Sequence, residues 1–367
     1  MQNRQSLKSQ LFLDLPLSSQ VPARGTRTPQ TTAVRSSLVP SPVFDTYWRF
    51  AAERQKVFFA RVNGEPAPWT TDPILFRYRF TNTYRASDRV SQYLISKIQY
   101  QGPQDSDSLF FRTILFKIFN KIETWEMLEG SLGTIHPHRG MERECSEVFE
   151  RAMSQGKKIY SAAYIMPSGT SAFAFARKHQ SHLALITHMM KERVPDRLRG
   201  CKTMQQAFSL LRSYPTLGDF LAYQYVTDLN YSELTTFSES EFVIPGPGAL
   251  SGIQKCFYST GPYSESDVIR WMVDHQEEEF RARGLRFQTL WGRQLQLIDC
   301  QNIFCEVDKY SRVFHPDIPG PFGRTRIKQE YKQNTKPLEY WFPPKWKLHL
   351  TQAKDLNQPS RRLTPSV

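Results

Sequence analysis

The 367-residue sequence is poor in cysteine, with five residues at irregular spacing. An odd, scattered set does not build a disulfide framework, so a reducing compartment fits better. No run of about eighteen apolar residues occurs, which argues against a membrane span. No Gly-x-x-x-x-Gly-Lys-Ser/Thr sequence occurs either. We therefore expect no P-loop kinase module in these 367 residues.

Residues that bind metals are also scarce. His136 and His138 lie close together but have no partner pair at ligand spacing, and Cys300 and Cys305 do not belong to two Cys-x-x-Cys pairs. Cys305 likewise lacks a recognisable histidine partner for a nucleophilic role. We expect neither a metal nor a cofactor.

Positive charge is concentrated at the two ends of the chain. Residues 1–42 hold five basic groups and one acid, or +4, and residues 320–367 hold ten and three, or +7. Only +2 of the net +13 is left for the 277 residues between them. Basic tails suit a phosphate backbone, which binds by counterion release. The competing interpretation is that these tails only keep the chain soluble.

The composition divides the chain into three parts. Residues 1–42 are rich in Ser, Thr, Gln, Pro and Arg and read as a disordered basic tail. Their low acidity and scattered arginines also resemble a transit peptide, so organellar targeting stays open. Residues 43–331 form the expected domain, and residues 332–367 form a second basic tail.

The hydrophobic pattern between the tails is mainly helical. Apolar residues recur with a period near 3.6 in most segments, and Ser264 with Asp267 forms a capping-box signature. Only Lys158–Ile165 has a strand-like pattern. Helices are expected at Val43–Val62, Arg89–Tyr100, Leu109–Leu128, Met141–Ser154, His179–Arg193, Met204–Ser213, Leu217–Leu229, 264–283 and Leu295–Tyr310. The fold class is therefore mainly α.

Two segments would place polar groups on one helix face. If the chain is helical from Asn82, then Asn82, Arg85, Arg89 and Gln92 share a face, where Arg can bind phosphate and Asn can read a base edge. In Leu295–Tyr310 the residues with the same spacing are Asp299, Asn302, Glu306 and Lys309. Such a stripe could build a site in which Lys309 and Glu306 tune each other's protonation. A solvated surface with salt bridges is the alternative in both cases.

Two loops are candidates for phosphate contacts. The stretch Tyr214–Gln224, followed by Asp228, is similar to a helix-hairpin-helix element, whose hairpin amides grip a phosphate. The alternative is an ordinary helix start with Asp228 in a C-terminal turn. Gly246 and Gly248 permit a tight turn and close backbone approach, so a phosphate-cradling loop is the second candidate.

Taken together, these segments resemble one family over almost 270 residues. Its pattern is seen in Trp69–Leu75, Phe80–Leu94, Arg112–Trp125, Leu217–Asn230, Pro245–Ile253 and Asp299–Tyr310. The family is the helical domain associated with 5-hydroxymethyluracil DNA kinases, and it is similar to the alpha-glutamyl/putrescinyl thymine pyrophosphorylases. The resemblance implies a helical, DNA-glycosylase-like fold and work on modified thymines in DNA.

The resemblance also implies roles for particular residues. A transferase would displace an activated phosphate from a flipped 5-hydroxymethyluracil-derived thymine, with Arg85 and Arg89 on the phosphate. Asp228 or Glu306, the latter tuned by Lys309, would act as general base. Asn82, Asn120 and Asn302 would position the base. The remaining DNA- or base-binding candidates are Arg112, Asp299, Tyr310, Gly246 and Gly248.

Two other functions remain open. The chain could be a non-catalytic DNA-binding module that partners a separate 5-hydroxymethyluracil DNA kinase, or a glycosylase-like enzyme that excises a modified base. DNA is the expected partner in every case, and no membrane is expected. The expected location is the nucleus in a eukaryote and the cytoplasm otherwise.

Overall fold

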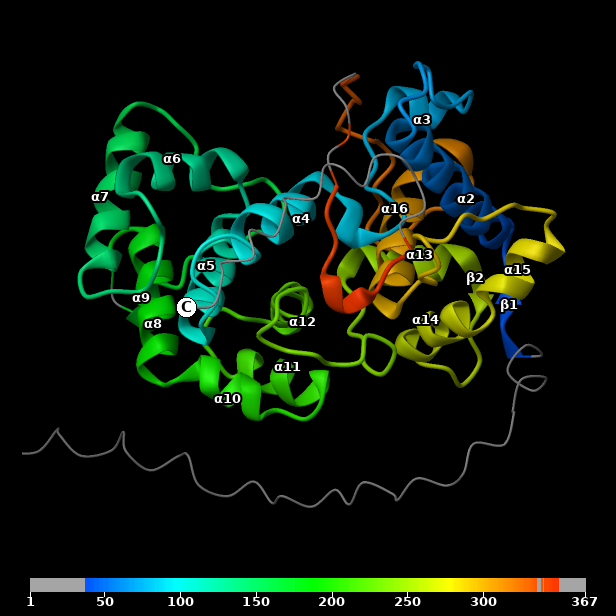
Figure 1. Ribbon diagram of the computed structural model, residues 1–367. Helices are drawn as coiled ribbons and strands as arrows, with labels where there is room; N and C mark the ends of the chain where they lie inside the picture. Colours follow the sequence, from blue (N-terminus) through cyan, green and yellow to red (C-terminus); the bar gives the residue numbers. More distant parts are fainter. Residues whose placement is uncertain (1–36, 174, 335–337, 339, 350–367) are drawn as a thin grey trace, which may run out of the picture. The chain divides into compact units, whose positions relative to one another are not determined.

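Figure 1 shows the computed structural model, which describes residues 37–173, 175–334, 338 and 340–349. These residues are mainly helical, which confirms the expected fold class. Their only two named strands, β1 (Val39–Pro40) and β2 (Phe257–Ser259), form one antiparallel pair. The expected basic tail over residues 1–36 and the last residues from 350 lie outside the described residues.

The helices follow one another with short connections. Those before residue 140 are α2 (Pro42–Val62), α3 (Pro73–Arg77), η1 (Arg85–Ser87), α4 (Arg89–Tyr93), η2 (Leu94–Gln99), α5 (Ser106–Phe119) and α6 (Ile122–Leu132). The next are α7 (Met141–Ser154), α8 (Thr170–Phe173), α9 (Lys178–Lys191), α10 (Val194–Gly200), α11 (Met204–Arg212) and α12 (Asp219–Leu229). The last are α13 (Pro247–Cys256), α14 (Glu265–Asp274), α15 (Gln276–Ala282), α16 (Leu297–Phe314) and η3 (Pro344–Trp346).

Helices α2, α13, α14 and α16 pack around a shared apolar core (Figure 1). The packing of α13 on α16 is the closest, because Gly252 faces the backbone of Phe304. A Cβ atom at Gly252 would lie 2.1 Å from the Phe304 carbonyl oxygen. The ring of Tyr47 on α2 packs 4.6 Å from that of Phe304. Glycine thus allows a backbone approach that no larger residue permits.

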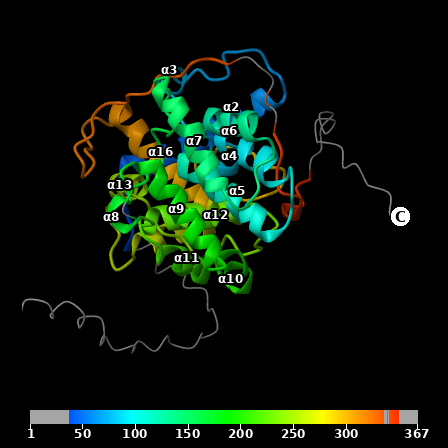
Figure 2. The same ribbon diagram turned by 90° about the vertical axis from the view of Figure 1, so that its left-hand side faces the viewer.

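A second group of helices surrounds α5. This helix is buried along nearly its whole length and contacts α9, α10 and α12, which lie near one another in both views (Figures 1 and 2). Buried phenylalanines provide much of the contact, and Phe119 packs 4.4 Å from Phe149 of α7. Since α12 also packs against α11, the hairpin between these two helices sits directly before the buried α12.

Most expected helices are confirmed within a few residues, including α2, α7, α9, α11, α12 and α16. The capping box at Ser264 is also confirmed, since its hydroxyl accepts from the Asp267 amide and the Asp267 carboxylate accepts from the Ser264 amide. The helix that begins there is interrupted at His275, which separates α14 from α15.

The chain is not helical from Asn82 onward, so the condition for a shared helix face is not met, while the helix expected at Arg89–Tyr100 is present as α4 and η2. Asp88 is extended, with φ −69° and ψ 147°, and the chain is a short 3-10 turn before it and a helix only after it. The Asp88 carboxylate accepts the Asn82 amide at 2.7 Å, and the Asn82 side chain donates to the Ser87 carbonyl at 2.8 Å. These side-chain bonds replace the helical ones. The four polar residues therefore do not share one helix face.

Two further expectations need correction. Leu109–Leu128 is two helices, because Asn120 adopts the left-handed conformation, with φ 48°, between α5 and α6. Asparagine is one of the few residues that does so readily. Lys158–Ile165 is not a strand. The Ser161 amide in this segment donates to the Phe119 carbonyl, and Tyr164 has φ 54°.

Residues on both sides of 43–331 contact this part of the chain. Ser41 caps α2, and its amide donates to the Cys256 carbonyl. At the other end, residues 340–349 contact the helices: the Trp341 amide donates to Gln92 and the His349 amide donates to the Trp291 carbonyl. We call residues 340–349 the C-terminal strap.

Candidate functional site

Three charged side chains meet in the interior, where η1, α5 and α12 come together. The guanidinium of Arg85 donates two hydrogen bonds to the Asp228 carboxylate, at 2.7 and 3.1 Å. The ammonium of Lys117 lies 3.1 Å from an oxygen of the same carboxylate. It also donates to the side chain of Asn120 at 2.8 Å. We call Arg85, Lys117 and Asp228 the ion cluster.

The backbone on each side holds these groups in place. Asn120 ends α5 in the left-handed conformation, and its side-chain oxygen accepts a hydrogen bond from Lys117. The Arg85 amide donates to Asp299 of α16 at 2.9 Å, and the side chain of Gln99 donates to the Asp228 carbonyl at 2.8 Å. Each member of the ion cluster therefore has a fixed position before any ligand is considered.

The ion cluster carries an excess of positive charge away from water. Its side chains are exposed by 3% (Arg85), 4% (Lys117) and 0% (Asp228). Burial would raise the pKa of Asp228, but its two cationic neighbours hold it below its ordinary value. Burial lowers the pKa of Lys117, although Asp228 opposes this. Two cations share one carboxylate, and the Nε atom of Arg85 is buried without a hydrogen-bond partner.

Aromatic rings complete the walls of the ion cluster. The Tyr231 hydroxyl accepts from Arg85 at 3.0 Å. The Tyr164 ring lies 4.6 Å from the Lys117 nitrogen and 6.0 Å from the Arg85 guanidinium carbon. Ring faces attract cations, so both contacts are favourable. Tyr164 stacks in parallel on Phe220, 5.7 Å away, and covers the ion cluster from the segment between α7 and α8.

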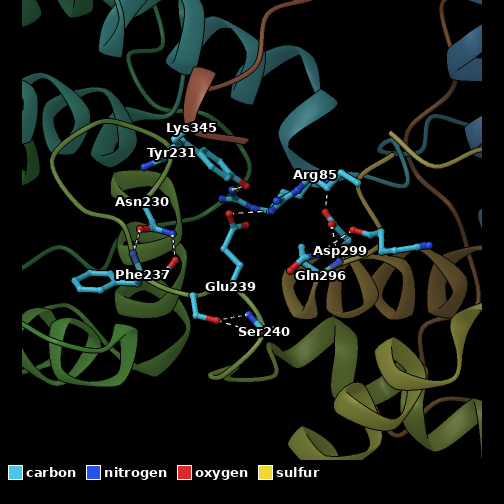
Figure 3. A network of polar contacts seen from close by, with 12 residues as sticks. Arg85, Asn230, Tyr231, Phe237, Glu239, Ser240, Gln296, Asp299 and Lys345 are labelled. Atoms are coloured by element: carbon cyan, nitrogen blue, oxygen red, sulfur yellow. Dashed lines mark hydrogen bonds and ion pairs between the residues drawn. The ribbon is translucent and has the colours of Figure 1, made fainter. Parts of the chain in front are cut away.

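A second ion pair lies next to Tyr231. Figure 3 shows Glu239, Tyr231 and the Arg85 side chain converging from different parts of the chain. The Glu239 carboxylate lies 2.9 Å from Arg293, and both side chains are largely buried. The Arg293 guanidinium carbon lies 3.9 Å from the ring centre of Trp346, whose edge meets Tyr231 at 5.7 Å. The strap therefore closes this side of the region.

The predicted stripe on α16 packs against residues 81–88. Asp299 accepts the Arg85 amide, as described above. The Asn302 side chain donates to the Thr81 hydroxyl at 3.1 Å and to the Asn82 carbonyl at 3.0 Å. The two segments that were predicted to carry polar stripes, the one from Asn82 and the one in Leu295–Tyr310, thus contact each other. Their polar groups are used in holding Arg85 in position.

Glu306 and Lys309 form the ion pair that the sequence predicts, at 2.7 Å. The same oxygen of Glu306 accepts the Thr81 amide at 2.9 Å. The nearby carboxyl of Asp88 has its pKa raised to about 7, chiefly by burial and also by the charge of Glu306. Glu306 thus lies near Asp88 and Lys309, two helical turns from Asp299.

Other predicted residues are held by local contacts. The side-chain oxygen of Asn82 accepts from Arg54 at 2.5 Å, so both ends of the Asn82 amide are bonded within the chain. Arg89 is exposed and lies apart from the ion cluster. The structure therefore brings Arg85, Asn120 and Asp228 together, but it does not bring Arg89 to them.

Arg112 and Tyr310 each fasten a neighbouring segment. Arg112 is buried and donates to the carbonyls of Ile98 and Gln101, at 3.0 and 3.1 Å. The Tyr310 hydroxyl donates at 2.6 Å to Asp72, whose carboxylate also caps α3. These contacts within the chain account for an arginine and a tyrosine at the two positions without a bound DNA.

The glycines of the predicted phosphate loop serve helix packing. Gly246 is the N-cap of α13, and a Cβ atom there would lie 2.6 Å from the Phe220 ring. A Cβ atom at Gly248 would lie 2.8 Å from the Cys305 sulfur. Close approach of side chains accounts for both glycines without a bound phosphate.

Two cavities lie away from the ion cluster. One of about 760 Å³ runs along α2 and is lined by residues that include Lys56, Phe59 and Arg286. A small one of about 60 Å³ is lined by residues that include Arg54 and Trp69. Neither is lined by the ion cluster, so a substrate would reach that cluster only after one of its covers moves.

The described part of the chain contains no group of three or more His, Cys, Asp or Glu side chains placed to hold a metal ion. None of its helices is long and apolar enough to cross a membrane.

Burial raises the pKa of the Cys305 thiol to about 12, so this thiol is protonated at neutral pH.

Several residues of the region were not predicted from the sequence. They are Lys117, Tyr164, Tyr231, Glu239 and Arg293. Lys117 had a usable signal, because it is one of two charged residues, with Arg112, in the apolar run Leu109–Phe119. The others come from irregular segments, where no periodicity relates one residue to another.

Comparison with known proteins gives this arrangement a family. The family model described as the helical domain of 5-hmdU DNA kinase matches residues 41–320. A protein named 5-hmdU DNA kinase, from Bacillus phage SP10, is 24% identical over 322 residues. The match covers 82% of this chain and 50% of the phage protein, so the chain spans about half the length of that relative. No solved structure matches. The matched range includes the whole ion cluster, and the chain belongs to the family of 5-hmdU DNA kinase helical domains.

Proposed function

We propose that this protein takes part in the hypermodification of 5-hydroxymethyluracil-derived thymines in DNA, as a transferase whose ion cluster binds the phosphate that leaves. One observation carries the proposal: two buried cations share one carboxylate, and a buried nitrogen of Arg85 has no acceptor. A buried charge is costly unless it is paired. A phosphate or pyrophosphate would provide the missing negative charge.

The reaction balances without a metal or an oxidant. The bond between the 5-methylene carbon and the phosphate oxygen breaks, and its electron pair leaves with the phosphate. The lone pair of an amine forms the new carbon–nitrogen bond, and the amine proton passes to a carboxylate. Arg85 and Lys117 would stabilise the leaving group electrostatically.

Glu239, which is paired with Arg293, is the carboxylate that we assign as general base because of its position beside Tyr231. Asp228 was predicted for this role, but its pKa lies below the ordinary value because both cations stabilise its charge. Glu306 is bound to Lys309 and to the Thr81 amide, away from the ion cluster. Glu239 lies beside Tyr231, next to Arg85. We assign Asp228 the role of holding the two cations in place.

The non-catalytic DNA-binding module is the second candidate. It is favoured by the depth of the ion cluster, because buried networks of this kind also serve only to fix a fold. In that case, a separate kinase would perform the chemistry. Both candidates require DNA contact, which the net charge of +13 supports, and place the protein in the compartment that holds the DNA.

The test is a reaction with defined DNA. Purified full-length protein is incubated with a duplex containing one 5-phosphomethyl- or 5-pyrophosphomethyl-deoxyuridine and a panel of amino acids and diamines. The digested nucleosides are analysed by mass spectrometry. Arg85→Lys keeps the charge but loses the two-pronged contact with Asp228, so we expect product formation to fall at least about tenfold. Arg143→Lys, on the exposed face of α7, is the matched control and should leave the rate unchanged.

Each outcome separates the candidates. An amine-substituted nucleoside together with released phosphate supports the transferase. Release of a free base would assign a glycosylase instead. Salt-sensitive binding of the duplex with no product from any amine would favour the binding module and overturn the catalytic proposal.

A further inference from the structure

Trp346 is seated between groups that suit a nucleic-acid base. The Arg293 guanidinium lies over one face of its ring at 3.9 Å, and Phe342 stacks 6.0 Å from it at an interplanar angle of 23°. Tyr231 meets its edge, and Tyr231 also accepts a hydrogen bond from Arg85. Aromatic rings and guanidinium planes are the surfaces on which proteins stack extruded or single-stranded bases.

The space that the Trp346 side chain occupies, which we call the seat, suits a pyrimidine ring better than an indole. The Nε1 atom of Trp346 is buried and has no hydrogen-bond partner. Buried tryptophan usually finds an acceptor, and leaving a buried donor without one is unfavourable. One oxygen of Glu239 lies 2.9 Å from Arg293, and the other oxygen of this carboxylate could accept the N3–H of a uracil ring. A pyrimidine could therefore bind Glu239 here, whereas the Trp346 N–H has no acceptor.

The strap is held by contacts that can be released. Lys345 donates hydrogen bonds to the carbonyls of Ser232 and Thr235, and no carboxylate of the described residues lies within salt-bridge distance of it. Burial lowers the pKa of Lys345 to about 8. Trp341 packs on Tyr100 at 4.3 Å, further along the same strap. These residues lie beyond position 320, where the family match ends.

We propose that Trp346 occupies the binding position of an extruded pyrimidine base, and that the C-terminal strap closes this position until DNA displaces it. The proposal rests on the proposed function and deepens it, because a base in this place adjoins Tyr231, whose hydroxyl accepts a hydrogen bond from Arg85. Arg293 would lie on the face of the base, Tyr231 would meet it nearly perpendicularly, and Glu239 would bind its edge.

The experiment measures base-dependent binding by fluorescence anisotropy. Two labelled duplexes are compared, one with a single 5-hydroxymethyluracil and one with a tetrahydrofuran abasic residue at that place. Trp346→Ala vacates the seat, and Trp341→Ala is the matched control in the same strap. If the strap closes the site most of the time, Trp346→Ala tightens binding of the first duplex about tenfold and leaves the second unchanged.

Further variants keep the proposal falsifiable. Lys345→Met loosens the strap without emptying the seat and should act in the same direction as Trp346→Ala, which matters if the latter fails to fold. Adding Arg293→Ala to Trp346→Ala should abolish the gain. Equal effects of Trp346→Ala and Trp341→Ala on both duplexes, or weaker binding of the 5-hydroxymethyluracil duplex, would overturn the base site.

The two proposals can fail separately. Tighter base-dependent binding by Trp346→Ala with no product in the mass-spectrometric reaction keeps the base site and removes the transferase. Product formation with no base-dependent effect of Trp346→Ala keeps the transferase and removes the base site.

Discussion

Replacing Asp228 with asparagine is the sharpest test of the ion cluster. Asparagine has nearly the same shape, so the change removes a charge and leaves no cavity. Its amide nitrogen would face Arg85 or Lys117, donor against donor. Both cations would then be buried without a carboxylate. We expect Asp228→Asn to destabilise the fold strongly.

The size of the effect follows from the geometry. Each cation attracts Asp228 by about 4 kcal/mol at a separation of ~4 Å and an effective dielectric constant of ~20. Relief from the burial of the carboxylate offsets part of this loss. Breaking a buried ion pair by removing one partner costs about 3–5 kcal/mol in measured cases. A free energy of unfolding lower by that amount is a large share of the roughly 5–15 kcal/mol of a typical domain.

Lys117→Met is the matched variant, because it removes one of the two cations and leaves Arg85 with Asp228. The remaining pair is neutral, and methionine fills much of the same volume. The variant loses the attraction to Asp228 and the hydrogen bond to Asn120, and both losses are offset by the relief of the excess buried charge. Lys117→Met should therefore destabilise much less than Asp228→Asn.

Urea unfolding followed by circular dichroism measures both changes at pH 7. A loss below about 1 kcal/mol for Asp228→Asn would refute the reasoning. So would a larger loss for Lys117→Met than for Asp228→Asn, because it would show that the carboxylate is not the group on which the charge balance depends.

Two other predictions concern packing and pH. Gly252→Ala should cost several kcal/mol in urea unfolding, because its Cβ would collide with the Phe304 carbonyl. Gly130→Ala, in α6 with open space around it, should instead stabilise by about 0.5–1 kcal/mol. Burial raises the pKa of Asp88 to about 7, so the folded state binds more protons than the unfolded state between about pH 4 and 7. Stability due to Asp88 should fall as pH rises through this window, and Asp88→Asn should flatten the profile of unfolding free energy against pH.

The helices could be predicted because their signals are local. Ser264 and Asp267 form a capping box within three residues, and the apolar period of Met141–Ser154 gives α7 with the same bounds. The failures arise where a side chain competes with the backbone. Asp88 binds the Asn82 amide from six residues away, which no helical period reveals.

The site could be predicted only in part, for a different reason. Arg85 and Asp228 were both selected, but for separate roles, since nothing in the sequence shows that residues 143 positions apart form one ion pair. Lys117 of α5 adds a second cation to this ion pair. Trp346 was missed because it lies in a segment expected to be a tail, and its neighbours Arg293 and Tyr231 are far from it in sequence.

The position of Arg85 links the predicted surfaces to the proposed reaction. Its backbone is bound to Asp299 of α16, while its side chain reaches Asp228 of α12. The polar stripe of α16 thus acts on the site indirectly, by fixing the segment from which Arg85 extends. A change in that stripe would shift the guanidinium without removing it, whereas a change in Asp228 would leave the guanidinium in place without its partner. The stripe and the ion cluster are therefore parts of one arrangement that is joined through Arg85.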